Sequence, residues 1–255
     1  MMKAYMQGCG NSFFIADATQ TILSDEGMEH TYHRLNGTRK VDGVIFVSGS
    51  DQAAVRMNYF DVDRHTGRLA RASMCGNGIR CIAKFASDLG YAGDSFDVET
   101  DDGIKEVCVA KGLVTVDMGY PRGFMQVSDD DFFVDVGLPH YVRFTDELDI
   151  ERTREEGAKV RYDTDILHML GDPRDAVQFN SVRVDSGNEI SILTREGGVE
   201  DVTLACGTGS VASAYVSSVA KGLRLPITVH NPGGDITVDV KDGKLVMTGP
   251  AEYIK

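Results

Sequence analysis

The sequence predicts an α+β protein made of two similar domains, and three observations support this prediction. Short apolar runs that alternate with polar residues recur along the chain, as is typical of half-buried β-strands. Two segments have clear helical periodicity. A Cys-Gly-x-Gly motif precedes each of these segments, once in each half of the chain, which indicates a repeated supersecondary unit.

The predicted strands are separated by turn signals such as Asp102-Gly103, Asp242-Gly243 and Pro232-Gly233-Gly234. In chain order, the predicted strands cover residues 13–16, 43–47, 107–110, 113–118, 182–184, 189–193, 227–229, 236–240 and 245–247.

The two clear helices are predicted over Ile79–Leu89 and Val211–Ala220. The first places apolar side chains on one face, and the second repeats small and β-branched residues at helical spacing. Two further helices are expected over Asp149–Glu156 and Thr164–Leu170.

The domain boundary is expected near residues 120 to 135, where Pro121-Arg-Gly and the acidic run Ser128–Asp131 interrupt the strand pattern. We therefore expect an N-terminal domain over residues 1–122 and a C-terminal domain over residues 123–255. The extreme C-terminus is expected to cross back to the first domain.

Composition excludes several classes of protein. The 255 residues are 42 % hydrophobic and 25 % charged, which argues against disorder, and a formal charge of −13 would repel nucleic acid. The longest apolar runs are far shorter than the roughly 20 residues of a membrane span, and the N-terminus lacks a signal-peptide core. We therefore expect a cytoplasmic protein with neither nucleic acid nor membrane as a partner.

The five cysteines are an odd number, which makes a disulfide framework improbable in such a chain. Two of them, Cys75 and Cys206, lie in the densest glycine clusters and directly precede the two clear helices. The first amide groups of a helix have no partner within the helix, so they can bind an anion. The helix dipole also favours a thiolate at this end.

Each motif can therefore offer a reactive sulfur together with amides that suit a carboxylate. If the halves are related by a pseudo-twofold axis, the two sulfurs would face each other across one cleft. Inversion of a carbon stereocentre needs a base on one face and an acid on the other. The pair Cys75 and Cys206 matches this requirement.

Four other roles for the two cysteines are possible. Neither lies in a Cys-x-x-Cys motif, which argues against zinc and against a thioredoxin-like dithiol. They could instead be small hydrophobic residues in glycine-rich turns. Finally, the helix ends could form a non-catalytic carboxylate-binding protein. The duplication of the motif favours chemistry.

Two segments that contain the cysteines, Met74–Cys81 and Thr203–Gly209, carry a family resemblance. They resemble the two catalytic motifs of the diaminopimelate epimerase family, whose members interconvert LL- and meso-diaminopimelate. Five further segments are similar to the family and occur in family order: Gly8–Phe13, Gly137–His140, Phe179–Val182, His230–Gly234 and Thr248–Glu252. The resemblance covers essentially the whole chain. It implies two similar domains, each a curled and mostly antiparallel sheet around a central helix, a homodimer, and no pyridoxal phosphate or metal.

The resemblance also implies roles for single residues. Cys75 and Cys206 would be the acid and base thiols. The amides of Gly76, Asn77, Gly207 and Thr208 would hold the carboxylate next to the reacting carbon. Asn11 and Asn180 would contact substrate, and His140 and Glu196 would lie near the reacting amino group and the thiols. Without the resemblance, these last four could equally be polar residues of turns and loops.

The chain departs from the family pattern where the far end of the substrate binds. The arginine expected after Glu196, which holds the distal carboxylate, is replaced by Gly197, and an asparagine is replaced by Asp61. Leu138 also replaces an asparagine, and residues 64–68 are inserted. Either Arg195, Arg56 or Arg68 substitutes for the missing arginine, or the substrate lacks a second carboxylate.

The sequence thus predicts a cofactor-independent amino-acid epimerase, with diaminopimelate as the first candidate substrate. The alternative is a racemase of the same family for a cationic amino acid such as histidine, lysine or ornithine, which Asp61 would suit. Related phenazine-biosynthesis-type isomerases lack the cysteine pair, so the two thiols argue against that class.

Overall fold

The computed structural model describes residues 1–63, 66–169, 177–197 and 199–255. The chain forms two compact units: unit 1 comprises Met1–Val116 with Gly249–Lys255, and unit 2 comprises Asp117–Thr248. The boundary expected between residues 122 and 123 lies within strand β9 of unit 2.

Unit 1 contains a curled sheet whose strand order is β18-β1-β2-β3-β4-β6-β7-β8, with β5 also paired to β4. The pairs β2–β3 and β4–β6 are parallel and the others are antiparallel. The strands are β1 (Lys3–Gly8), β2 (Asn11–Asp17), β3 (Gly43–Ser48), β4 (Val55–Val62), β5 (Leu69–Ala72), β6 (Ser95–Thr100), β7 (Gly103–Ala110), β18 (Glu252–Tyr253) and β8 (Leu113–Gly119), whose last three residues belong to unit 2.

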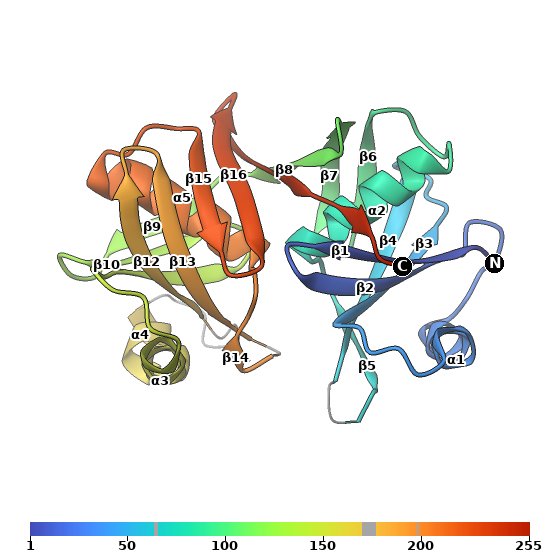
Figure 1. Ribbon diagram of the computed structural model, residues 1–255, viewed down its shortest axis with the longest axis horizontal. Coiled ribbons are helices and arrows are strands. Elements are labelled where there is room, and N and C mark those ends of the chain that lie inside the picture. The colour runs from blue at the N-terminus through green and yellow to red at the C-terminus, as the bar shows by residue number, and fades with distance from the viewer. Residues whose placement is uncertain (64–65, 170–176, 198) are drawn as a thin grey trace. The chain divides into compact units, whose positions relative to one another are not determined.

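Two helices of unit 1 cover opposite faces of its sheet. Helix α2 (Gly76–Asp88) packs against β1, β2, β3, β4 and β7 (Figure 1). Helix α1 (Asp25–Asn36) places Met28 and Tyr32 in a cluster with Phe14, Phe46 and other buried residues. Since β2 and β3 are buried on both faces, their sequences are continuous apolar runs rather than alternating ones.

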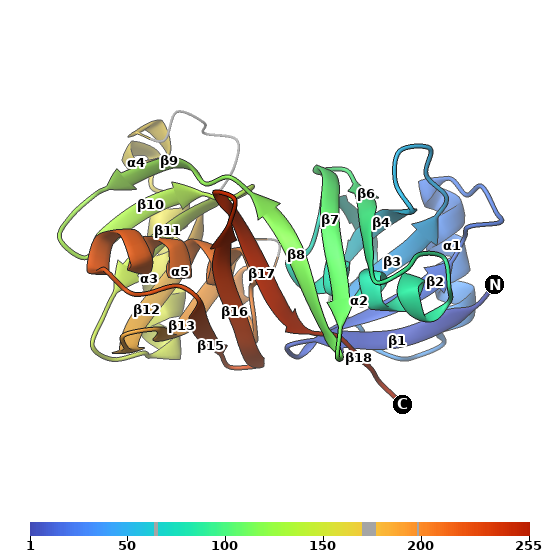
Figure 2. The same cartoon turned by 90° about the horizontal axis from the view of Figure 1, so that it is seen from above.

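Unit 2 contains the strand order β9-β10-β11-β12-β13-β15-β16-β17, with β14 also paired to β13. Its strands are β9 (Arg122–Gln126), β10 (Asp131–Asp135), β11 (Pro139–Phe144), β12 (Gln178–Ser186), β13 (Glu189–Glu196), β14 (Asp201–Val202), β15 (Ile227–Asn231), β16 (Gly234–Lys241) and β17 (Lys244–Pro250), whose last two residues belong to unit 1. Helix α5 (Gly207–Lys221) packs against β10–β13, β15 and β16 (Figure 2). Helix α3 (Ile150–Arg161) packs against β12, β13 and β14, and α4 (Thr164–Met169) follows it.

The two units repeat one topology. In unit 1, the pairs β2–β3 and β4–β6 are parallel, and β1–β2, β3–β4, β4–β5, β6–β7 and β7–β8 are antiparallel. In unit 2, the corresponding pairs β11–β12 and β13–β15 are parallel, and β10–β11, β12–β13, β13–β14, β15–β16 and β16–β17 are antiparallel. Helices α2 and α5 occupy the same place in this order. The predicted fold class, two similar α+β domains with a central helix in each, is confirmed.

Both central helices begin earlier than their periodicity suggests. They start at Gly76 and Gly207, because Cys75 and Cys206 are extended N-cap residues and the glycine-rich turn is already helical. Helix α3 also extends beyond its predicted end, to Arg161, and the final residue of the helix expected over Thr164–Leu170 lies outside the described residues. The elements that were not predicted are helix α1 and strands β1, β4, β5, β6, β9, β10, β11, β14 and β18.

Within the described residues, no helix is both long and apolar enough to cross a membrane.

The fully buried Arg80 is expected to be a main source of stability in unit 1. Its guanidinium donates to the carbonyls of Pro250 at 3.2 Å and Gly76 at 3.2 Å, and to Asn77 Oδ1 at 2.9 Å. Arg80→Met removes these buried hydrogen bonds from a charged donor, so we expect a loss of about 3 kcal/mol in unfolding free energy, measured by urea denaturation. The control Arg34→Met, on the exposed side of α1, should change it by less than about 0.5 kcal/mol. Equal stability of the two variants would contradict this assignment.

Candidate active site

The first Cys-Gly motif places a thiol at the start of α2. Cys75 is the N-cap residue and has an extended backbone, with φ −133° and ψ 123°, and its side chain makes no capping hydrogen bond. A Cβ added at Gly78 would lie 3.0 Å from Met57 Cε and 3.2 Å from Ile45 Cδ1. The glycine therefore lets the first turn approach the sheet closely, which holds the thiol beside β4.

The second motif repeats this arrangement in unit 2. Cys206 is the N-cap of α5, and its Sγ accepts a hydrogen bond from the Gly209 amide at 3.3 Å. Thr208 Oγ1 lies 3.4 Å from the same sulfur. A Cβ added at Gly209 would lie 2.6 Å from Asn180 Oδ1, so glycine is again required where the helix meets the sheet.

The two thiols differ in their surroundings. Cys206 is 4 % exposed, and its pKa is raised well above the ordinary value, first by burial and then by the neighbouring Glu196 carboxylate. The hydrogen bonds from Thr208 and Gly209 oppose this shift. Cys206 is therefore a protonated thiol at neutral pH in this conformation, whereas Cys75 is only partly buried.

Glu196, at the end of β13, is held beside Cys206 by a hydroxyl group. Thr203 Oγ1 donates a short hydrogen bond to Glu196 Oε1. A carboxylate next to a thiol can accept its proton or stabilise it in the protonated form. Of the expected site residues, Gly207, Thr208, Asn180 and Glu196 all lie around Cys206 in unit 2.

His140 lies in the interior of unit 2 and is fully buried. Asn180 Nδ2 donates to the backbone carbonyl of Tyr141 at 3.1 Å and lies 3.1 Å from His140 Nδ1, while Thr194 Oγ1 donates to Asn180 Oδ1 at 2.9 Å. Burial lowers the pKa of His140 to about 3. With Nδ1 accepting from Asn180, the neutral ring carries its proton on Nε2, a buried atom without a partner in the described part of the chain.

Asn11 is carried by the tight turn between β1 and β2. Cys9 and Gly10 both have positive φ, at 51° and 79°, and the turn pairs Gly8 with Asn11. Among the described residues, none forms a hydrogen bond with the buried Asn11 Oδ1. In the first turn of α2, the side-chain oxygen Oδ1 of Asn77 accepts a hydrogen bond from Arg80. Arg80, which follows the first Cys-Gly motif, thus orients Asn77, although we predicted no role for Arg80 from the sequence.

Asp61 lies on β4, close to the first motif. It keeps access to solvent and accepts a short hydrogen bond from the hydroxyl of Tyr59, two residues earlier on the same strand. Tyr59 is 5 % exposed and interacts with both Asp61 and Cys75. Partial desolvation raises the pKa of Asp61, and the Tyr59 hydrogen bond opposes this.

The space beside Gly197 is filled by an arginine from another element. A Cβ added at Gly197 would lie 2.6 Å from the guanidinium carbon of Arg161, in the last turn of α3. Arg161 Nη2 forms an ion pair with Glu200 at 3.1 Å, and Arg195 Nη2 binds the other oxygen of Glu200 at 3.1 Å. Two guanidinium groups therefore share one carboxylate next to Glu196.

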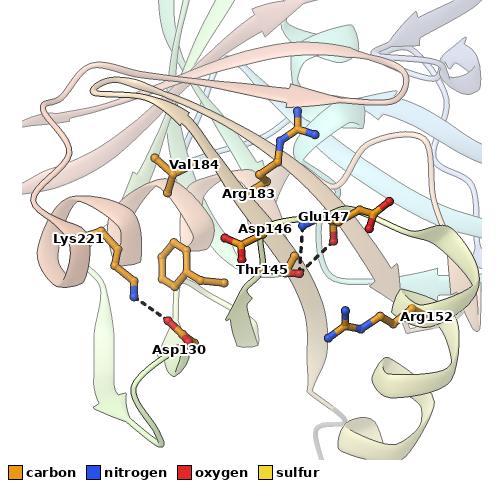
Figure 3. A pocket seen from close by; sticks show the side chains of 9 residues that line it. Asp130, Thr145, Asp146, Glu147, Arg152, Arg183, Val184 and Lys221 are labelled. Atoms are coloured by element: carbon orange, nitrogen blue, oxygen red, sulfur yellow. Dashed lines mark hydrogen bonds and ion pairs between the residues drawn. The ribbon is translucent and has the colours of Figure 1, made fainter.

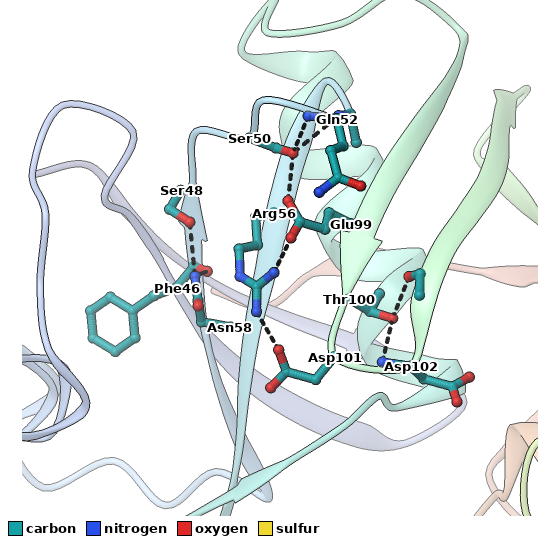
Figure 4. Close-up of polar contacts among 12 residues, drawn as sticks. Phe46, Ser48, Ser50, Gln52, Arg56, Asn58, Glu99, Thr100, Asp101 and Asp102 are labelled. Carbon is teal, nitrogen blue, oxygen red and sulfur yellow. Dashed lines mark hydrogen bonds and ion pairs between the residues drawn. The ribbon is translucent and has the colours of Figure 1, made fainter.

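Of the three arginines suggested by the sequence, Arg195 shares Glu200 with Arg161, and Arg56 and Arg68 lie elsewhere. Arg56 is held in unit 1 by Glu99 and Asp101 (Figure 4). Arg195 packs beneath α3, where its Cδ would lie 2.9 Å from a Cβ added at Gly157. Arg68 is exposed in the β4–β5 loop, and residues 64 and 65 of the predicted insertion lie outside the described residues. Sequence reasoning missed Arg161, because no local motif marks it.

Unit 2 also has a surface recess that is separate from these residues. The recess, of about 690 Å³, is lined by charged and polar side chains that include Arg152, Arg183 and Lys221 (Figure 3). Lys221 is paired with Asp130 at 2.8 Å. None of the expected site residues lines it. Within the described ranges, no group of three or more His, Cys, Asp and Glu side chains is placed to hold a metal ion.

Comparison with known proteins adds independent information. The family model described as diaminopimelate epimerase matches residues 3–123 and 132–254. A diaminopimelate epimerase of Methanothrix thermoacetophila is 35 % identical over 96 % of this chain and 91 % of its own length. Those of Archaeoglobus fulgidus and Bacillus subtilis are 32 % and 33 % identical, each over 98 % of this chain and over 92 % and 95 % of their own lengths.

Solved structures share the fold at lower identity. A phenazine biosynthesis protein of the PhzF family from Bacillus anthracis aligns with a TM-score of 0.69 at 17 % identity, covering 99 % of this chain and 96 % of the other. A hydroxyproline epimerase from Agrobacterium vitis aligns with a TM-score of 0.68 at 13 % identity, covering 99 % and 90 %.

The Glu196 carboxylate should control the reactivity of Cys206. Glu196→Gln removes a negative charge that disfavours the thiolate, so the pH profile of Cys206 alkylation should move to lower pH by about one unit. Iodoacetamide labelling followed by peptide mass spectrometry measures this profile for each cysteine separately. Glu189→Gln, at the exposed start of the same strand, is the matched control and should leave it unchanged. A profile that does not move in Glu196→Gln would show that the carboxylate does not act on the thiol.

Proposed function

Since this chain belongs to the diaminopimelate epimerase family, we propose that it inverts the α-carbon of an amino acid with Cys75 and Cys206 as its two acid–base groups, and that diaminopimelate is its substrate. The observation that carries the proposal is the duplicated cysteine at the N-terminus of a buried central helix. The second candidate, a racemase for a cationic amino acid, is favoured by Asp61, whose carboxylate keeps access to solvent.

The reaction needs a thiolate on one face of the α-carbon and a thiol on the other. The thiolate removes the α-proton, and the opposite thiol donates its proton to the other face, so the two groups exchange protonation states. Cys206, whose pKa is raised by burial and by Glu196, fits the proton donor for one direction. No pyridoxal phosphate or metal is part of this proposal.

The carbanion formed at the α-carbon requires stabilisation by fixed dipoles. The amides of Gly76, Asn77, Gly207 and Thr208 begin the two helices and would hold the adjacent carboxylate, as expected from the sequence. Two buried polar atoms, one in each unit, have no hydrogen-bond partner among the described residues and can bind a ligand. These atoms are Asn11 Oδ1, which can accept from an ammonium group, and His140 Nε2, which can donate to a carboxylate or a thiolate.

Arg161 favours a substrate with two carboxylates. Its guanidinium occupies the space that a side chain at position 197 would fill, directly after Glu196. Arg161 and Arg195 both bind the Glu200 carboxylate. A guanidinium suits bidentate recognition of a carboxylate, so Arg161 is the candidate to bind the distal carboxylate of the substrate. A homodimer in the cytoplasm remains an expectation from the sequence.

Both thiols are expected to be essential. Cys75→Ala and Cys206→Ala should each lower epimerisation of LL-diaminopimelate at least about 100-fold, because each removes one proton-transfer group. Chiral chromatography measures the product, and mass spectrometry in deuterium oxide should show one deuteron at the α-carbon per turnover. The exposed Cys108→Ala is the control and should retain activity. Turnover without deuterium incorporation would contradict the mechanism.

Arg161 should determine selectivity for the second carboxylate. Arg161→Ala should raise the KM for diaminopimelate about 10-fold to 100-fold, because a charge-assisted hydrogen bond is lost. Adding Gly197→Arg to this variant should recover part of the loss, since Arg161 no longer fills the space. Arg183→Ala, an exposed arginine of β12, is the control. Better turnover of L-histidine, L-lysine or L-ornithine than of diaminopimelate by the unaltered protein would favour the second candidate function instead.

A further inference from the structure

The internal repeat places Asp61 in unit 1 where Glu196 stands in unit 2. Asp61 is paired with Ala70 across β4 and β5, and Glu196 is paired with Asp201 across β13 and β14. Ala70 and Asp201 each lie five residues before the cysteine of their unit. The two carboxylates therefore have equivalent positions relative to Cys75 and Cys206, although the loop between the strands is longer in unit 1.

The two units differ in what lies between the carboxylate and the sulfur. In unit 2, Glu196 interacts directly with Cys206. In unit 1, Tyr59 interacts with both Asp61 and Cys75, so its hydroxyl links them. The Tyr59 ring is fixed by packing: its centroid lies 6.3 Å from that of Phe13 in an edge-to-face contact, and its Cε2 lies 2.8 Å from a Cβ added at Gly43. A ring held in this way keeps its hydroxyl in place.

We propose that Tyr59 is a positioning residue for Cys75, and that its hydroxyl relays a proton between the Cys75 thiol and the Asp61 carboxylate. The proposal rests on the proposed function for the role of Cys75 in proton transfer. It assigns Asp61 a part in the chemistry in addition to any contact with substrate.

The relay conserves protons and charge. As the S–H bond of Cys75 breaks, the proton passes to the Tyr59 oxygen, and the O–H bond of Tyr59 breaks as its proton passes to an Asp61 oxygen. The result is a Cys75 thiolate that accepts a hydrogen bond from Tyr59, and a neutral Asp61. Because Asp61 has access to solvent, it can release the proton to water. Burial, together with the nearby Cys75 and Asp61, raises the pKa of Tyr59 well above its ordinary value, so Tyr59 passes protons as a neutral phenol.

Other ionisable groups of unit 1 lie around Cys75 but do not offer the same route. Cys81, on α2, is fully buried, and burial strongly raises its pKa. Cys9, in the β1–β2 turn, is 4 % exposed and lies 3.5 Å from Nη2 of Arg80. Arg80 is itself fully buried and remains a cation. In contrast to these three groups, Asp61 has both a hydrogen-bonded path from Cys75 and access to solvent.

A relay of this kind serves a two-thiol epimerase, because each turnover leaves the protonation states of the two thiols exchanged. The enzyme must return one proton to solvent and take up another before it can repeat the same direction. Cys206 has Glu196 beside it for this exchange, and Tyr59 with Asp61 would provide the corresponding path for Cys75.

The test measures Cys75 alkylation by iodoacetamide as a function of pH, by peptide mass spectrometry, in the full chain without substrate. Tyr59→Phe removes the donor to the thiolate, so the Cys75 profile should move to higher pH, with about tenfold slower labelling below its midpoint. Asp61→Asn removes the negative charge and the competing acceptor, so the profile should move to lower pH. In the Tyr59→Phe background, Asp61→Asn should have a much smaller effect, since the link is gone.

Tyr5→Phe is the matched control, because Tyr5 also donates to a polar partner in unit 1, Asn36 at 3.0 Å, away from Cys75. It should leave the Cys75 profile unchanged, and thermal unfolding confirms that all variants are folded. An unchanged Cys75 profile in Tyr59→Phe would overturn the relay. The same holds if Asp61→Asn shifts the Cys75 profile equally with Tyr59 present and in the Tyr59→Phe background. Since labelling needs no turnover, absence of epimerisation by the unaltered protein would refute the proposed function separately.

Discussion

The architecture of both units depends on the close approach of a helix N-terminus to the sheet, with a cysteine as the last extended residue before the helix. Gly78 and Gly209 permit this approach. A Cβ at Gly209 would lie only 2.6 Å from Asn180 Oδ1, and a Cβ at Gly78 would make a tight contact of 3.0 Å with Met57 Cε. The first turn of each helix is thereby buried, and in α5 the Gly209 amide donates to Cys206 Sγ. A larger residue in either glycine position would displace both the thiol and the amides, so packing and the proposed chemistry depend on the same contact.

The repeat gives each unit a cysteine in an equivalent position, but the surroundings of the two thiols differ. Equivalent strands supply a carboxylate near each cysteine, but its contacts differ. Glu196 interacts directly with Cys206 and accepts from Thr203, which follows β14, whereas Asp61 accepts from Tyr59 of the same strand β4. Cys206 is buried and its thiol is held in the protonated form, while Cys75 is partly exposed. Two similar groups in different surroundings have different proton affinities, and such a difference favours an acid on one side and a base on the other.

Local patterns account for what could be predicted from the sequence. The two cysteine motifs and the central helices were predicted because glycine clusters and helical periodicity are both local signals. Helix α1 escaped prediction because its buried residues Met28, Thr31, Tyr32 and Asn36 do not form an apolar stripe. Strand β4 escaped because Arg56, Asn58 and Asp61 interrupt its apolar residues, and their partners come from other elements. Such contacts are set by tertiary packing, which single-sequence patterns do not contain.

Arg161 shows the same limit at the site itself. A glycine at position 197 indicates from the sequence that an arginine has been lost, and the nearest candidate in the chain is Arg195. The fold instead places Arg195 beneath Gly157 of α3, and the end of α3 brings Arg161 over Gly197. Because Gly197 lacks a side chain, the Arg161 guanidinium can occupy that space, so each residue is compatible with the other. The structure thus places a guanidinium beside Gly197 from a helix distant in the sequence, and this contact depends on the packing of α3 on β13, which no local motif encodes.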